Sequence, residues 1–131
     1  MKKLFISCPM KDRTKEAIEE SFNTMHKIAE IMQGEKLEVI QSYIEDDPPE
    51  GVNEHIWYLG KSIIKLAEAD YFIGIDYGGV LKGSNLYSMC EVESILARNY
   101  NIPTVELNYR TLKCFDDLWK TKRNATEDEG E

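Results

Sequence analysis

The sequence predicts an α/β protein with helices on both faces of a mainly parallel sheet of four to five strands. Short apolar segments typical of strands alternate with segments of helical periodicity, and this alternation favours parallel strands joined by helical crossovers. Residues 71–75 form an uninterrupted apolar run bounded by aspartates, as expected of a strand that is covered on both faces. Right-handed crossovers would place helices on both sides of such a sheet.

The first strand is predicted over residues 3–8, and it ends before Pro9, which cannot donate a hydrogen bond to a neighbouring strand. Thr14 is a favourable N-cap for the helix that follows, and Gly34 is the expected stop, because a left-handed residue usually follows a helix end. The apolar stripe of this helix is spaced by four, three, four and three residues, and it comprises Ile18, Phe22, Met25, Ala29 and Met32.

A second strand is predicted over residues 37–44, followed by a loop with two prolines and a glycine over residues 45–53. A helix over residues 54–68 comes next, weakened at Gly60 by about 1 kcal/mol relative to alanine. The sequence leaves undecided which of two adjacent residues belongs to its apolar face at three places: Trp57 or Tyr58, Ile63 or Ile64, and Leu66 or Ala67.

After the strand at residues 71–75, Ser88 and Glu91 have the spacing of a capping box at a helix start. In that helix one side is predicted to hold Val92, Ile95, Leu96 and Asn99, with Glu93 and Ala97 on its flank. A further strand over residues 103–107 and a short amphipathic helix over residues 112–119 complete the predicted elements.

The chain of 131 residues is long enough for one domain with a hydrophobic core. We expect this single α/β domain to cover residues 1–120, and an acidic, disordered tail to cover residues 121–131. The net charge of −8 argues against binding to duplex nucleic acid, which requires a basic face. No apolar run is as long as a membrane span, and three widely spaced cysteines suit reduced thiols, so a cytoplasmic protein is expected.

Two glutamates in the helix after the central strand are candidates for chemistry. Residues two apart on a helix point about 200° apart, so Glu91 and Glu93 cannot both reach one pocket. The capping box assigns Glu91 to a structural role, whereas Glu93 lies near a helix N-terminus, whose dipole favours an ionised carboxylate. Such a carboxylate can attack a sugar C1 through an oxocarbenium-like transition state, although a solvent-facing glutamate would have the same pattern.

Cations and hydroxyls after the first strand are suited to holding a phosphate. Ser7, Lys11 and Arg13 lie close to a helix N-terminus, but the segment lacks the spacing of a P-loop or a dinucleotide motif, and an ordinary exposed turn would have the same residues. The acids of the proline-rich loop, Glu45, Asp46, Asp47 and Glu50, have ligand chemistry for magnesium, but such carboxylates are usually solvated. We therefore expect neither a metal nor a cofactor.

Three separated segments resemble the nucleoside 2-deoxyribosyltransferase family, especially its small phage and bacterial members. They are FISCPM at residues 5–10, ADYFIGID at residues 69–76, and a glutamate followed by alanine after four residues and proline after ten, at Glu93, Ala97 and Pro103. The resemblance covers about residues 3–107 and implies a flavodoxin-like or Rossmann-like fold in three layers. It also implies deoxyribose transfer between bases, or hydrolysis of the N-glycosidic bond of a deoxynucleoside 5'-monophosphate.

By this resemblance the nucleophile is Glu93, and the segment after the first strand helps to bind a 5'-phosphate. Since ligands lie at the carboxyl ends of parallel strands, Asp76 and Tyr87 are expected to assist orientation or proton transfer. The expected substrate-binding residues are Ser7, Pro9, Met10, Lys11, Arg13, Ser62, Gly78, Ser84, Asn85 and Glu91.

The chain departs from the family at three positions. Ser62 and Tyr87 stand where the family usually has aspartates, and Ile95 stands where a glycine is common. These departures leave open which group protonates the leaving base; Asp76 or Glu91 could substitute.

Two hypotheses follow. The first is an enzyme acting on a 2-deoxynucleoside or its 5'-monophosphate through Glu93. The second is a protein that binds or sequesters a nucleotide, of phage origin for example, without catalysing a reaction. In either case the expected partner is a small nucleoside or nucleotide, and a homo-oligomer, dimeric or larger, is implied by the resemblance and by the apolar residues 112–119.

Overall fold

Four parallel strands and three helices alternate along the chain, as the sequence predicts. The computed structural model describes residues 1–8, 14–41, 44–76 and 88–108. Its elements, in order, are β1 (Lys2–Ile6), α1 (Lys15–Gln33), β2 (Leu37–Val39), α2 (Glu54–Leu66), β3 (Tyr71–Asp76), α3 (Ser88–Asn99) and β4 (Thr104–Asn108). The α/β class is therefore confirmed. The predicted helix at residues 112–119 and the acidic tail lie outside the described residues.

The sheet has the strand order β2-β1-β3-β4, and every neighbouring pair is parallel. This is the order of a flavodoxin-like doubly wound sheet, in which the chain moves to one side of β1 and then to the other. In such sheets ligands bind beyond the carboxyl ends of the two strands where the direction reverses. Here these strands are β1 and β3, which pair from Leu4 opposite Tyr71 to Ile6 opposite Ile73.

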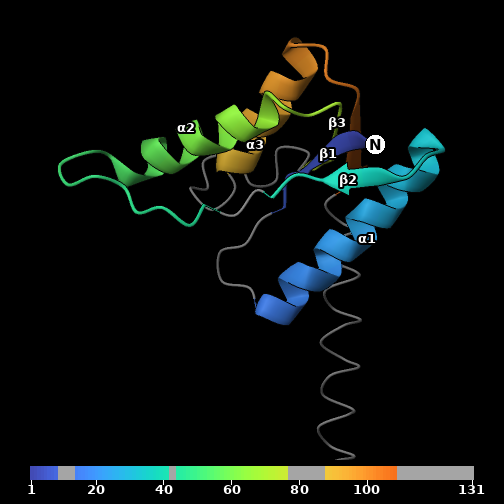
Figure 1. Ribbon diagram of the computed structural model, residues 1–131, viewed down its shortest axis with the longest axis horizontal. Coiled ribbons are helices and arrows are strands. Elements are labelled where there is room, and N and C mark those ends of the chain that lie inside the picture. Colours follow the sequence, from blue (N-terminus) through green and yellow to red (C-terminus); the bar gives the residue numbers. More distant parts are fainter. Residues whose placement is uncertain (9–13, 42–43, 77–87, 109–131) are drawn as a thin grey trace, which may run out of the picture.

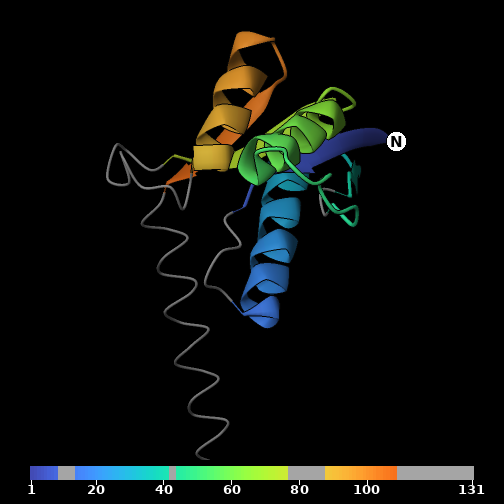
Figure 2. The same cartoon turned by 90° about the vertical axis from the view of Figure 1, so that its left-hand side faces the viewer.

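Helices cover both faces of the sheet in three layers. Figures 1 and 2 show α2 and α3 together on one face and α1 on the other. Alternate residues of β1 and β3 supply two separate cores. On the α1 face, Leu4, Ile6 and Ile73 pack with Met25 and Ala29. On the α2/α3 face, the core comprises Phe5, Ile40, Leu66, Phe72 and Ala97.

The ends of α1 are the ones that its sequence predicts. Thr14 has an extended backbone, and its side chain accepts a hydrogen bond from the amide of Ala17 at 3.1 Å. Gly34 closes the helix in the left-handed conformation, with φ of 72°. The predicted apolar stripe is wrong at Met32, whose side chain is 64% exposed. The buried positions progress by four residues from Ala17 to Ala29, so they drift away from position 32 at the end of the helix.

Packing also resolves the faces of α2 and corrects that of α3. Leu66 is buried in α2, whereas Ile64 is exposed. In α3 the predicted apolar side is not the buried one, because Ile95 is 47% exposed while Glu93, Ser94 and Ala97 are buried. Glu93 and Ser94 are buried because they form hydrogen bonds with the rest of the domain. The hydropathy of the sequence does not predict such bonds.

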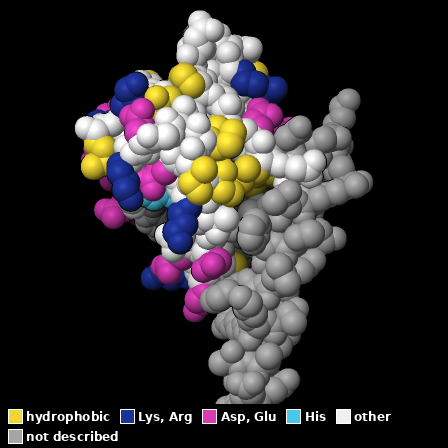
Figure 3. All heavy atoms as spheres, turned by 90° about the vertical axis from the view of Figure 1, so that its right-hand side faces the viewer, with side chains coloured by type: hydrophobic (Ala, Val, Ile, Leu, Met, Phe, Trp, Pro, Cys, Tyr) yellow, Lys and Arg dark blue, Asp and Glu magenta, His cyan; other side chains and the backbone are white. Residues whose placement is uncertain are grey.

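The surface carries charges of both signs. In Figure 3, Lys and Arg side chains alternate with Asp and Glu side chains around a group of hydrophobic side chains. None of the helices in the described part of the chain has both the length and the apolar character of a membrane-crossing segment.

Candidate functional site

A buried glutamate at the carboxyl end of the sheet is the centre of the candidate site. The side chain of Glu93, in the second turn of α3, is only 6% exposed. Its Oε1 accepts a hydrogen bond from the hydroxyl of Ser7 at 2.9 Å, and its Oε2 accepts one from the hydroxyl of Ser62. Both oxygens of one carboxylate are thus held by serines from two other parts of the chain.

The fold brings these three residues together from distant positions in the sequence. Ser7 directly follows β1, and its amide donates to the carbonyl of Ile73 in β3 at 2.9 Å. Ser62 is one of the buried residues of α2, and α2 packs beside α3 on the same face of the sheet. The carboxylate of Glu93 therefore lies where β1 and β3 end, at the reversal point of the strand order.

Burial and hydrogen bonding act in opposite directions on Glu93. Loss of contact with water raises the pKa of its carboxyl group, because burial disfavours the charged form. The hydrogen bonds from Ser62 and Ser7 lower this pKa, but by less than burial raises it. The net increase differs from the effect of the helix dipole alone, which would keep the group ionised.

A cysteine that the sequence analysis did not select lies near the site. Burial, and after it the neighbouring Glu93 carboxylate, raise the pKa of Cys90 to about 12. The thiolate is the nucleophilic form of cysteine, so Cys90 remains a neutral, unreactive thiol at physiological pH. It packs against the core on the α1 face, which is the common role of a half-buried cysteine.

Gly74 leaves β3 without a side chain next to the site. A Cβ at this position would lie 2.7 Å from Cε1 of Phe72 and 3.7 Å from Cβ of Ser7. The ring of Phe72 is fully buried and stacks on Phe5 with a centroid distance of 5.8 Å. A glycine is therefore required here by close packing, and the sequence alone gave no sign of that requirement.

Three of the predicted site residues contact one another in the structure, and Glu91 lies apart from them. Ser7, Ser62 and Glu93 form a single hydrogen-bonded group. Glu91 is exposed in the first turn of α3, as expected if residues two apart occupy different faces. The backbone of Asp76 ends β3, where it pairs with Asn108. The remaining predicted site residues lie outside the described ranges: Pro9, Met10, Lys11, Arg13, Gly78, Ser84, Asn85 and Tyr87.

The four acids of the proline-rich loop are exposed. Throughout the described ranges, no three His, Cys, Asp or Glu side chains gather closely enough to hold a metal ion. The magnesium interpretation of Glu45, Asp46, Asp47 and Glu50 is therefore not supported by their placement.

The carboxylate of Glu93 can act as a nucleophile or as a proton acceptor once a ligand lies beside it. Two hydroxyl donors fix its plane, and each oxygen retains capacity beyond the single serine that it binds. A fixed carboxylate at the reversal point of a parallel sheet can meet a ligand without reorganising.

Comparisons of the chain with protein families, with curated proteins and with solved structures yielded no match.

Proposed function

We propose that the protein acts on the N-glycosidic bond of a 2-deoxynucleoside or its 5'-monophosphate, with Glu93 as the nucleophile. The observation that carries this proposal is the buried Glu93 carboxylate at the carboxyl ends of β1 and β3, with a serine hydroxyl on each oxygen. A solvent-facing helix glutamate would have neither this burial nor these donors. The resemblance of three sequence segments to nucleoside 2-deoxyribosyltransferases supplies the reaction class.

The reaction would proceed in two steps. An oxygen of Glu93 forms a bond to C1' of the deoxyribose, while the electrons of the C1'–N bond leave with the base, which takes up a proton. Water or a second base then attacks C1', the ester bond breaks to regenerate the carboxylate, and the attacking water or base gives up a proton. Water gives hydrolysis, and a second base gives transfer.

The two serines would orient the nucleophile and stabilise its charge. Hydrogen bonds to a carboxylate favour its ionised form, and both Ser7 and Ser62 lower the pKa of Glu93 against the effect of burial. Buried surroundings in turn strengthen the attraction between the carboxylate and an oxocarbenium-like C1'. A monophosphate substrate is favoured by Lys11 and Arg13, which follow β1 in the sequence.

One observation favours the second candidate function, nucleotide binding without catalysis. Within the described residues, the Glu93 carboxylate is hydrogen-bonded to hydroxyls alone, and serine is too weak an acid to protonate a leaving base. A glycosidase normally has a second carboxyl group for that step. Protonation would have to come from another residue, such as Asp76 or Tyr87, or from solvent.

Base release separates the two candidates. The protein is incubated with each deoxynucleoside and each 5'-monophosphate, with and without a second base, and free and exchanged bases are followed by chromatography. Catalysis through Glu93 predicts release that falls by at least about 10³-fold in Glu93→Gln, because removal of a covalent nucleophile removes the pathway. Glu20→Gln is the matched control, since Glu20 is an exposed glutamate of α1, on the other face of the sheet.

Equal base release by the wild type and Glu93→Gln would contradict the nucleophilic role. No release by the wild type, together with an increased Tm on addition of nucleotides, would support binding alone.

A further inference from the structure

Glu93 and the next residue attach α3 to two different strands. Glu93 accepts a hydrogen bond from Ser7, which follows β1. Ser94 is equally buried, at 6% exposed, and its hydroxyl donates to Oε1 of Glu106 in β4 at 2.8 Å. In the sheet order, β1 and β4 lie on opposite sides of β3, so consecutive residues of α3 hold it on both sides of the central strand.

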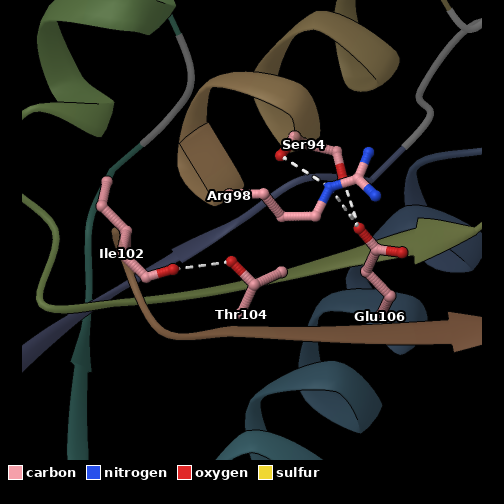
Figure 4. Close-up of polar contacts among 5 residues, drawn as sticks. All are labelled: Ser94, Arg98, Ile102, Thr104 and Glu106. Atoms are coloured by element: carbon pink, nitrogen blue, oxygen red, sulfur yellow. Dashed lines mark hydrogen bonds and ion pairs between the residues drawn. The ribbon is translucent and has the colours of Figure 1, made fainter. Parts of the chain in front are cut away.

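Arg98, one turn further along α3, joins the contact with β4. Figure 4 shows its guanidinium group between the backbone of Ser94 and the carboxylate of Glu106. The Nε atom of Arg98 lies 3.2 Å from Oε1 of Glu106 and 3.5 Å from the carbonyl oxygen of Ser94. One oxygen of Glu106 thus receives both the Ser94 hydroxyl and the Arg98 cation.

Between these two contacts lies Gly74 of the middle strand, where the buried ring of Phe72 fills the space that a side chain would need. Glu106 is the register partner of Gly74, and a Cβ at Gly74 would lie 3.7 Å from Cβ of Ser7. Gly74 therefore separates the strand residue that binds Glu93 from the strand residue that binds Ser94. The middle strand itself meets α3 through Phe72, which shares a hydrophobic core with Ala97 and Leu96.

Contacts at two consecutive positions restrain the rotation of a helix about its own axis. Successive residues of a helix are rotated by about 100° around its axis. Core packing of Ala97 and the two serines on Glu93 already hold α3. A further polar contact about 100° away from Glu93 restrains the roll of the helix in a second direction. In this helix a roll would carry the Glu93 carboxylate away from Ser7 and Ser62.

We propose that the contact of Ser94 with Glu106, supported by Arg98, restrains the roll of α3 in addition to core packing and makes Ser94 and Glu106 positioning residues for the Glu93 carboxylate. This inference rests on the proposed function for its meaning in catalysis, but the positioning itself can be measured in the absence of any reaction. Ser94 and Glu106 are not among the hydrogen-bond partners of the Glu93 carboxylate in the described residues; they act on it through the backbone of α3.

The test follows the titration of Glu93 by NMR in protein carrying a ¹³C label at glutamate side-chain carboxyl carbons, with Glu93→Gln used to assign the signal. In Ser94→Ala the helix loses the hydroxyl contact with Glu106 and keeps the Arg98 ion pair, so α3 is less restrained, the hydrogen bond from Ser7 weakens and the Glu93 titration moves to higher pH. Among the residues that the structure describes, the groups that face Glu93 are Ser7 just after β1, Ser62 in α2 and Cys90 in α3. None of them titrates in the acidic range, so they do not obscure the shift.

Two variants serve as controls. Glu106→Gln removes the charge that pairs with Arg98 but keeps an oxygen that can accept from Ser94, so the Glu93 titration should shift less than in Ser94→Ala. Thr104→Ala removes the hydroxyl of the first residue of β4, which donates to the carbonyl of Ile102 in the preceding turn at 2.8 Å (Figure 4). This hydrogen bond does not join α3 to the sheet, so its loss leaves the titration unchanged.

If base release is observed, Ser94→Ala should lower kcat by about 10- to 100-fold with little change in KM, because a small displacement of a reacting group is costly. Thr104→Ala should lower neither. A wild type that releases no base refutes the proposed function, while the NMR titration still decides the positioning.

The positioning is overturned if Ser94→Ala lowers the Tm but leaves the Glu93 titration where it is in the wild type. It is also overturned if Thr104→Ala shifts that titration as much as Ser94→Ala does.

Discussion

At the scale of single residues, Glu93 has an environment that costs stability and suits chemistry. Its carboxyl group is buried, and burial raises its pKa despite two hydroxyl donors. Positions that destabilise the native state in this way are frequently functional, because activity and stability make different demands on a side chain. The same environment makes the role of Glu93 in stability measurable.

We expect Glu93→Gln to stabilise the protein at neutral pH. Between the ordinary pKa of glutamate and the raised pKa of Glu93, the native state binds more protons than the unfolded state, so the wild type loses stability as pH rises through this range. Glutamine cannot ionise and can still pair with both serines. The free energy of unfolding, measured by denaturant titration at several pH values, should therefore differ most at neutral pH and least in acid.

Glu91→Gln is the control for this experiment, since Glu91 is exposed and should show no comparable difference. Parallel pH profiles for the wild type and Glu93→Gln would contradict the expectation.

At the scale of elements, two glycines differ in whether the structure has room for a side chain in their place. Gly74 lies in β3, and a Cβ there would lie 2.7 Å from the buried ring of Phe72. Gly60 lies within α2, and a Cβ there would have nothing within 4 Å. A strand glycine beside a packed ring excludes a methyl group, whereas a helix glycine in open space only adds flexibility to the unfolded chain.

We expect Gly74→Ala to destabilise the protein by about 1–3 kcal/mol, the usual cost of forcing a methyl group into a packed core. Gly60→Ala should stabilise it by about 0.5–1 kcal/mol through helix propensity. Thermal or denaturant unfolding of the two variants and the wild type measures both effects. The packing around Phe72 would be disproved by a Gly74→Ala variant as stable as the wild type.

Much of the fold could be predicted from the sequence at the level of single helices and strands. Thr14 and Gly34 identified the ends of α1, because caps depend on the local backbone. The uninterrupted apolar run in β3 identified a strand covered on both faces. The inward face of α3 was not predictable, because hydrophobicity favoured Ile95 whereas the folded helix buries Glu93 and Ser94.

At the scale of the whole molecule, one sheet supports two hydrophobic cores. Strand residues alternate between the faces, so Leu4 belongs to the core with α1 and Phe5 to the core with α2 and α3. Since the same strands supply both cores, neither core can form without the sheet. The described part of the domain is therefore expected to unfold as one cooperative unit.

Substitutions on opposite faces test this cooperativity. Met25 is 0% exposed on the α1 face, and Leu66 is 3% exposed on the α2 face. We expect Met25→Ala and Leu66→Ala each to cost about 2–5 kcal/mol, with a single transition by far-UV and near-UV circular dichroism. The exposed Met32→Ala, on the same helix as Met25, should change stability by no more than about 0.5 kcal/mol. Two separate transitions in either core variant would show that the faces unfold independently.

The sequence by itself determined the α/β class, the order of the elements and the ends of α1, because periodicity and capping act within a few residues of one another. It also selected Ser7, Ser62 and Glu93 individually as candidate residues. Only the tertiary structure decided that these three form one hydrogen-bonded group, and that Ser94 and Glu106 lie beside it across the sheet. Those contacts join residues 12 to 86 positions apart. Such residues come together only when the strands and helices pack, so no local sequence pattern predicts that they meet.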